Sequence, residues 1–159
     1  MESSSLQVRR YLPGDESNIL DTFNLVFRQE CGPAFRDRTL AEWQWLYAHN
    51  PAGCQIFLAV DDDGTVAAQY AAIPQTADTP VGALRFVHVV DSMTHPAYRA
   101  GLQRTGVFAK LGRAFTADYR DHGNENGYGF PVSPAERLRR RLLDSRLPRP
   151  RDHLLRSTP

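Results

Sequence analysis

The segment that most constrains the fold covers residues 86–108, with the sequence FVHVVDSMTHPAYRAGLQRTGVF. It starts with aromatic and β-branched residues typical of a strand, passes a His-Pro pair, and ends near Gly106, where an amphipathic helix is expected to begin. The first N–H groups of a helix have no partner within the helix, and the helix dipole is positive there. A loop that leads from a strand to such a helix end can therefore hold a phosphate group. Two arginines, Arg99 and Arg104, add positive charge to the same loop.

The chain as a whole predicts one mixed α/β domain. Its 159 residues, 42% of them hydrophobic, are enough for a sizeable core. Hydrophobic periodicity and turn residues give the element order β-α-α-β-β-β-α-β-α, with a central sheet and helices on its faces. Strands are expected over residues 6–11, 56–60, 65–73, 85–92 and 127–132. Helices are expected between the turn at residues 13–15 and the break at Gly32-Pro33, and over residues 39–49, 107–119 and 133–147.

Short motifs mark where several of these elements begin or turn. Thr39-Leu40-Ala41-Glu42 is a capping box, and Ser133-Pro134-Ala135-Glu136 combines a capping serine, a first-turn proline and the matching glutamate. Asp61-Asp62-Asp63-Gly64 predicts a hairpin turn. A polar loop that contains Pro74 and Pro80 is expected before the strand at residues 85–92.

Two motifs carry a resemblance to a known family. Ser92-Met93-Thr94-His95-Pro96-Ala97-Tyr98-Arg99, followed by Gln103-x-x-Gly106-x-Phe108, resembles the central motif of the GNAT N-acetyltransferases. In that family a hydrophobic-x-Pro-x-Tyr-Arg run ends a strand, and the next loop wraps the pyrophosphate of acetyl-CoA. Gly127-Tyr128-Gly129-Phe130-Pro131 resembles the fifth strand of one GNAT subgroup. The element order over residues 6–147 also fits, so the resemblance implies a GNAT-like fold over most of the chain.

The chain also departs from the family pattern. Phe108 stands where the family usually has a small residue, and more residues than usual separate Arg99 from Gly106. Family members normally continue with two more strands after the fourth helix. We therefore expect residues 1–147 to form a GNAT-like acetyl-CoA-binding domain with a truncated C-terminal part, and residues 148–159 to form an arginine- and proline-rich tail or one short strand. The missing strands could belong to a longer protein or to a second copy that completes the sheet, or the chain could be a reduced module.

The resemblance also implies which residues bind acetyl-CoA. In the family, the pantetheine arm pairs like an extra strand with the backbone of the fourth strand, which here includes Asp91, Ser92, Met93 and Thr94. The pyrophosphate is expected at the following loop and helix start, mostly through backbone N–H groups. The residues expected there are Gln103, Arg104, Thr105, Gly106, Val107 and Phe108.

The candidate catalytic residues are Asp91 or His88 as general base and Tyr128 as general acid. GNAT enzymes often use a carboxylate or histidine on the fourth strand and a tyrosine on the fourth helix, but the fourth helix expected here contains no tyrosine. His88 lies in an apolar strand and is also compatible with a structural role. Because Asp91 is three residues further on, regular alternation predicts that the two side chains point to opposite faces of the sheet.

Several function classes are disfavoured by composition. The net charge of +1 argues against a dedicated nucleic-acid binder. Arginines crowd residues 137–156, where we prefer a solvated helix face to an RNA-binding surface. No histidine or cysteine spacing predicts a metal site. Two cysteines, no signal peptide at the start and no long apolar run predict a cytoplasmic protein without a membrane partner.

Two functional classes remain. The first is an N-acetyltransferase, or its acetyl-CoA-binding portion, that acts on a small-molecule or peptide amine. The second is a non-catalytic GNAT-like module that binds coenzyme A or a protein partner without turnover. The early end of the chain and the missing helix tyrosine favour the second.

Overall fold

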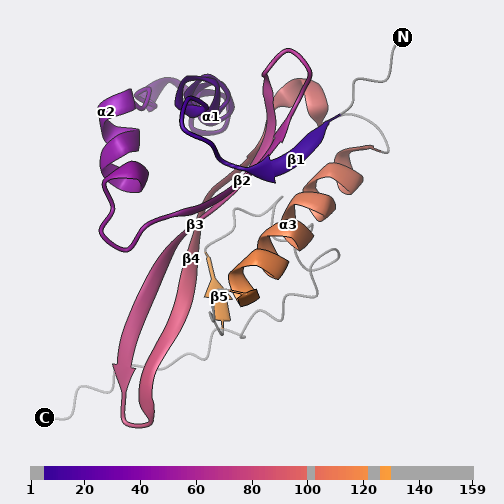
Figure 1. Ribbon diagram of the computed structural model, residues 1–159. Helices are drawn as coiled ribbons and strands as arrows, with labels where there is room; N and C mark the ends of the chain where they lie inside the picture. Colours follow the sequence, from indigo (N-terminus) through magenta and orange to yellow (C-terminus); the bar gives the residue numbers. More distant parts are fainter. Residues whose placement is uncertain (1–5, 100–102, 122–125, 130–159) are drawn as a thin grey trace, which may run out of the picture.

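The computed structural model describes residues 6–99, 103–121 and 126–129, which form a five-stranded mixed sheet with helices on both faces (Figure 1). The strands lie side by side in chain order, antiparallel from the first to the fourth, and the fifth is parallel to the fourth. They are β1 (Gln7–Arg10), β2 (Gln55–Val60), β3 (Val66–Thr79), β4 (Gly82–Thr94) and β5 (Asn126–Tyr128). The mixed α/β fold predicted from the sequence is confirmed.

Two helical layers cover the sheet. On one face lie α1 (Glu16–Cys31) and α2 (Leu40–Trp43), which continues as the π turn η2 (Gln44–Ala48); on the other face lies α3 (Gln103–Asp121) (Figure 1). Two short 3₁₀ turns, η1 (Gly32–Ala34) and η3 (Pro96–Tyr98), follow α1 and β4. Amphipathic helices of this kind bury their apolar stripes against the two faces of the sheet.

Each face of the sheet therefore has its own core. The α1–α2 core joins apolar side chains of both helices to β2, β3 and β4; its members include Phe23, Trp43, Tyr47, Leu58 and Met93. The α3 core lies on the opposite face and includes Phe57, Tyr70, Val87, Phe108 and Leu111. Because neighbouring residues of a strand point to opposite faces, β2, β3 and β4 contribute to both cores.

The capping box predicted at Thr39 is confirmed. The Thr39 hydroxyl accepts a hydrogen bond from the Glu42 N–H at 3.3 Å, and Glu42 Oε2 accepts one from the Thr39 N–H at 2.8 Å. Together these bonds satisfy two donors at the start of α2, which explains why the helix begins where the sequence predicted.

The prediction of a polar loop between residues 73 and 85 is wrong. β3 continues to Thr79, β4 begins at Gly82, and the two strands form a long hairpin that extends beyond the helices (Figure 1). Pro74 lies inside β3, opposite Val87. Because β2 pairs with β3 only as far as Ala72, Pro74 lies where β3 has become an edge strand among the described strands, a position that tolerates a proline.

Two element boundaries also differ from the prediction. Helix α3 begins at Gln103 instead of residue 107, so Gly106 lies in its first turn. The described part of β5 ends at Tyr128, and Gly129 lies outside the strand. The predicted fourth helix over residues 133–147, the tail over residues 148–159, and Phe130 and Pro131 lie outside the described residues. Among the described helices, none combines the length and apolar character needed to cross a membrane.

Candidate active site

A β-bulge interrupts β4 at Asp91. Val90 pairs with Ala71 and Met93 pairs with Gln69, so Asp91 and Ser92 together lie opposite the single residue Tyr70. Asp91 has φ 48°, in the left-handed region that aspartate and asparagine tolerate better than most residues. Bulges of this kind redirect side chains and are frequent next to functional sites.

The bulge places Asp91 and His88 on the same face of the sheet. His88 pairs with Ile73, which packs against the α1–α2 core, and directly opposed residues of antiparallel strands share a face. The Asp91 carboxylate contacts Arg38 and Tyr47, which also belong to that side. The prediction that Asp91 and His88 point to opposite faces is therefore wrong, because the extra residue of the bulge reverses the alternation.

Asp91 is held by two donors. Its Oδ2 atom forms an ion pair with Arg38 and accepts a hydrogen bond from the Tyr47 hydroxyl at 2.7 Å. Burial, and then the Asp91 charge, raise the pKa of Tyr47 well above its ordinary value, which keeps its hydroxyl protonated as a donor.

Arg38 is itself fixed in place. Its N–H donates to Asn24 Oδ1 at 2.8 Å, its carbonyl accepts from Asn24 Nδ2 at 3.1 Å, and its guanidinium lies 3.8 Å from the centre of the Phe23 ring. Sequence reasoning missed both Arg38 and Tyr47. A tyrosine in the apolar stripe that follows Trp43 was the available signal, since a buried hydroxyl needs a partner.

A buried glutamine supports the bulge from β3. Gln69 is 1% exposed, and its Nε2 donates to the backbone carbonyl of Asp91 at 3.0 Å. Among the described residues, its Oε1 and the Oγ of Ser92, which belongs to the bulge, are buried atoms without a hydrogen-bond partner. The bulge thus combines an anchored backbone with buried oxygen atoms that can accept further hydrogen bonds.

Among the described residues, the pairs between β4 and β5 end before the bulge. The last pair joins His88 to Tyr128, whereas β4 continues to Thr94. Within the described chain, the stretch that contains Ser92, Met93 and Thr94 therefore has no strand pairing on its β5 side. These residues were predicted to bind pantetheine, which needs an unpaired strand edge of this kind.

The first turn of α3 contains several of the residues that the sequence predicts to bind the pyrophosphate. Gln103, Arg104 and Thr105 lie in this turn, where N–H groups lack partners within the helix. Gly106 is exposed, and a Cβ built on it would meet no described atom within 4 Å outside its own helix turn. Within the described part of the chain, the position next to Gly106 therefore has room for a ligand.

Two other predicted phosphate-site residues belong to the core. Phe108 is buried and its ring centre lies 5.8 Å from that of Tyr70, while Val107 is partly buried against the same α3 core. A large residue at position 108 thus fills the space between α3 and the sheet, which accounts for this departure from the family pattern.

The turn after β4 uses the charge of Arg99. The Arg99 Nε donates to the Thr94 carbonyl at 2.9 Å, and its Nη1 lies 2.9 Å from Glu30 at the end of α1. Burial, and then the Arg99 charge, lower the pKa of His95. Arg99 therefore anchors the connection to α1, in addition to any charge that it contributes to a ligand.

Tyr128 and His88 lie in contact at the end of the β4–β5 ladder. Their rings stack with centres 4.7 Å apart and planes 5° from parallel. The Tyr128 hydroxyl donates to Gln75 Oε1 on β3 at 2.7 Å, and the Phe86 ring centre lies 5.8 Å from that of Tyr128. The structure therefore brings together two of the three predicted catalytic residues, with Asp91 further along β4 on the same face.

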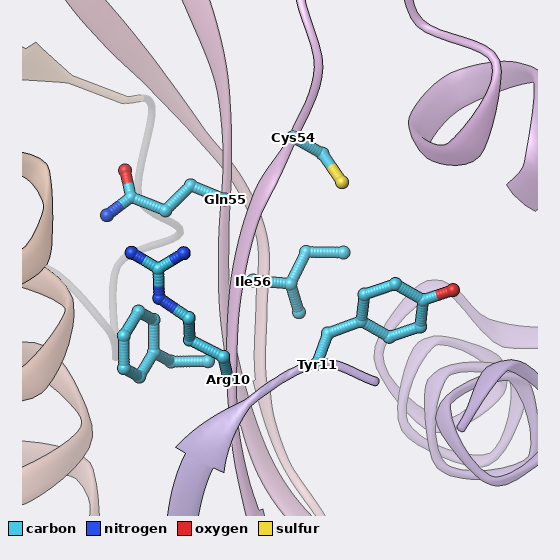
Figure 2. Close-up of a pocket in the computed structure, with 6 residues that line it drawn as sticks. Arg10, Tyr11, Cys54, Gln55 and Ile56 are labelled. Carbon is cyan, nitrogen blue, oxygen red and sulfur yellow. The ribbon is translucent and has the colours of Figure 1, made fainter. Parts of the chain in front are cut away.

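A separate small pocket lies at the opposite edge of the sheet, where β1 ends beside β2 (Figure 2). Figure 2 shows Arg10 and Gln55 on one side of β2, and Tyr11 and Cys54 on the other. The Arg10 guanidinium forms an ion pair with Asp118 of α3. Because β5 lies at the other edge, this pocket is not part of the candidate active site.

Comparison with known proteins identifies a family. The family model described as "Acetyltransferase (GNAT) domain" matches residues 7–140. Among curated proteins, none matches the sequence.

Several solved structures are similar in fold. A Trypanosoma brucei acetyltransferase is 17% identical, with a TM-score of 0.67 over 90% of this chain and 94% of that one. Glucosamine-6-phosphate N-acetyltransferase from Arabidopsis thaliana is 11% identical, with a TM-score of 0.67 over 91% and 94%. An aminoglycoside acetyltransferase from an uncultured soil metagenomic sample, in complex with sisomicin, is 15% identical, with a TM-score of 0.67 over 86% of each chain. At these identities the likeness concerns the fold.

Proposed function

Because the chain belongs to the GNAT acetyltransferase family, we propose that it transfers an acetyl group from acetyl-CoA to a small-molecule or peptide amine. The observation that supports the proposal is that a bulged strand, β4, is followed along the chain by a helix, α3, whose first turn contains the exposed Gly106. β4 bulges at Asp91 and continues without a β5 partner in the described chain, and the first turn of α3 then presents its N–H groups beside the exposed Gly106.

The described residues fit acetyl-CoA as co-substrate. The backbone of Ser92, Met93 and Thr94 would pair with the amide groups of pantetheine, and the first turn of α3 would hold the pyrophosphate. Since these contacts use backbone groups, the size of the side chains at the helix start matters more than their chemical identity. Gly106 meets this requirement of size most directly.

The chemistry requires positioning and a route for one proton. The amine nitrogen attacks the thioester carbonyl carbon, the carbon–sulfur bond breaks, a base takes the amine proton, and the leaving thiolate receives a proton from an acid. We propose His88 as the base, because imidazole is the most frequent general base in enzymes and the His88 ring is in contact with Tyr128, the proposed acid. Asp91, the other candidate, already accepts two hydrogen bonds on one oxygen and serves better as an anchor. Tyr128 remains the proposed acid, although its hydroxyl is directed at Gln75 here.

Calorimetric titration of acetyl-CoA tests the binding step. Wild-type chain should bind acetyl-CoA, and Gly106→Trp should abolish binding while leaving the thermal unfolding midpoint close to that of wild type, because the space over Gly106 is open. Absence of binding by a folded wild-type chain, or binding that survives Gly106→Trp, would contradict this site.

A second candidate function is a non-catalytic module that binds coenzyme A or a protein partner. It is favoured by the engagement of the Asp91 carboxylate with Arg38 and of the Tyr128 hydroxyl with Gln75. Release of free thiol from acetyl-CoA in the presence of a broad amine panel separates the two functions. A chain that binds acetyl-CoA and never consumes it would be this module.

The remaining sequence predictions stay part of the proposal. They are a cytoplasmic location, the absence of nucleic-acid and membrane partners, and, as one of three alternatives for the missing strands, a second copy that completes the sheet. Gel filtration combined with light scattering would test the last of these, since a monomer would contradict it.

A further inference from the structure

We propose that the rings of Phe86, His88 and Tyr128 form an aromatic platform that selects acceptor amines carried on an aromatic ring. This inference rests on the proposed function and adds the class of acceptor. It depends on three observations: the rigid placement of the Tyr128 ring, its position beside the candidate catalytic residues, and the lack of charged side chains on the surrounding face of the hairpin.

The Tyr128 ring is fixed at both ends. Its backbone belongs to β5, whereas its hydroxyl donates to Gln75 Oε1 on β3 at 2.7 Å. Since β4 lies between these two strands, the side chain reaches across β4 to make this bond. The His88 ring is stacked against it at 4.7 Å, and Phe86 approaches it at 5.8 Å. A side chain held in this way loses little conformational freedom when a ligand binds.

The platform is partly accessible and lies beside the site. Tyr128 is 39% exposed, and Phe86 and His88 are half-buried. His88 is the last β4 residue with a β5 partner in the described ladder, and the bulge at Asp91 follows on the same face. An amine that approaches the thioester from this face would therefore place its carrier group against the platform.

The surrounding face of the hairpin is uncharged. Going outward along the hairpin from Ile73 and His88, the described residues on this face are Gln75, Ala77, Thr79, Leu84 and Phe86. The charged hairpin residues Asp78 and Arg85 share the other face with Val87, which belongs to the α3 core.

This distribution of charge disfavours polycationic acceptors. A polycationic aminosugar would need several carboxylates, and the nearest described one on this face, Asp91, is already paired with Arg38. An amine with an aromatic ring needs only ring contacts for its body, and ring pairs of suitable geometry add favourable energy beyond the buried area.

The test compares two acceptors that differ in one six-membered ring, aromatic and planar in one and saturated in the other, with a third acceptor that carries several charges. Phenethylamine and cyclohexylethylamine carry the same ammonium group on rings of similar size, and sisomicin serves as a polycationic probe. Each is titrated by calorimetry into the full chain saturated with coenzyme A. Phenethylamine should bind about two- to tenfold more tightly than cyclohexylethylamine, the range that aromatic pairs provide, and sisomicin should bind more weakly than both.

Three variants link that preference to the platform. Tyr128→Leu should reduce the preference for phenethylamine to about onefold, whereas Tyr128→Phe, which keeps the ring but loses the bond to Gln75, should retain part of it. Phe86→Leu should lower it to an intermediate value. Acetyl-CoA affinity and the unfolding midpoint of each variant verify that the fold and the donor site are intact.

The outcomes separate the platform from the proposed function. The platform would be overturned if phenethylamine and cyclohexylethylamine bound with equal affinity, or if sisomicin bound more tightly than both. A preference for phenethylamine that survives Tyr128→Leu would overturn it as well. If acetyl-CoA binds and is consumed with non-aromatic amines alone, the proposed function stands and the platform is wrong. If acetyl-CoA does not bind, both are wrong.

Discussion

At the scale of single residues, Asp91 does the most to shape the site. It adopts a left-handed backbone conformation, it accepts hydrogen bonds from Arg38 and Tyr47, and its carbonyl accepts one from the buried Gln69. These contacts hold one oxygen and the backbone of the same residue. The bulge is therefore fixed from the side of α1 and α2, and none of these described contacts lies on the β5 side of β4, where we propose that acetyl-CoA binds.

Substitutions at Asp91 should separate its charge from its conformation. Asp91→Ala should lower the free energy of unfolding by about 2–3 kcal/mol, because it removes hydrogen bonds to a charged group and places alanine in the left-handed region. Asp91→Asn should cost about half as much, since asparagine tolerates that region and can still accept from Tyr47. Urea unfolding measures both.

The matched control for this pair is Asp21→Asn, an exposed aspartate of α1, which should change the free energy of unfolding by less than about 0.5 kcal/mol. Equal losses for Asp91→Ala and Asp91→Asn would mean that backbone strain contributes nothing. A loss no larger than that of the control would mean that the Arg38 and Tyr47 contacts do not stabilise the fold.

At the scale of elements, α3 combines a buried stripe with an open N-terminal turn. Phe108 and Leu111 attach the helix to the sheet, whereas Gly106 faces open space. The packing of the helix and the proposed binding role of its first turn thus use different residues. Substitutions at Gly106 can therefore change ligand binding without disturbing the core.

Gly106→Ala should change stability and binding in opposite directions. Alanine is the better helix former, so the free energy of unfolding should rise by about 0.5–1 kcal/mol. Its methyl group would occupy the space proposed for the pyrophosphate, so acetyl-CoA affinity should fall. Thermal unfolding and calorimetry on the same preparation measure both. A stabilised variant with unchanged acetyl-CoA affinity would mean that the pyrophosphate does not bind at this turn.

Local signals in the sequence predicted most elements but not the hairpin or the bulge. The capping box at Thr39 and the turn at Asp61–Gly64 depend on neighbouring residues, and both are present in the structure. The extended pairing of Pro74 with Val87 depends on where β2 ends, which no window around Pro74 reveals. The bulge at Asp91 likewise depends on the register with Tyr70. Regular alternation therefore gave the wrong face for Asp91, and Arg38 and Tyr47 went unnoticed as its partners.

At the scale of the whole molecule, the described chain has two cores that share one sheet. The α1–α2 core and the α3 core lie on opposite faces, and β2, β3 and β4 contribute side chains to both. If one core unfolds, the three shared strands lose half of their side-chain packing, and this weakens the other core too. We therefore expect the two faces to unfold in one cooperative transition.

A substitution in one core should be detected in the other. Leu111→Ala removes a fully buried side chain of α3 and should lower the free energy of unfolding by about 2–5 kcal/mol. In a Trp45→Phe background, which removes the exposed second tryptophan, Trp43 is buried on the opposite face and provides a fluorescence signal for the α1–α2 core. Its urea midpoint should shift together with the midpoint from circular dichroism. A shift in circular dichroism alone would mean that the two faces unfold separately.

The long hairpin of β3 and β4 has a mechanical consequence. Among the described strands, its outer part is a two-stranded ribbon joined to the sheet at one end, with Val81 at the tip 89% exposed. Tyr128 fastens the side of this ribbon through Gln75. Because the ribbon is attached at one end, we expect a small rotation near Gln75 to move the tip further than it moves Gln75 itself. A fluorescent label at position 81 would therefore signal the arrival of an acceptor from a place that the acceptor does not touch.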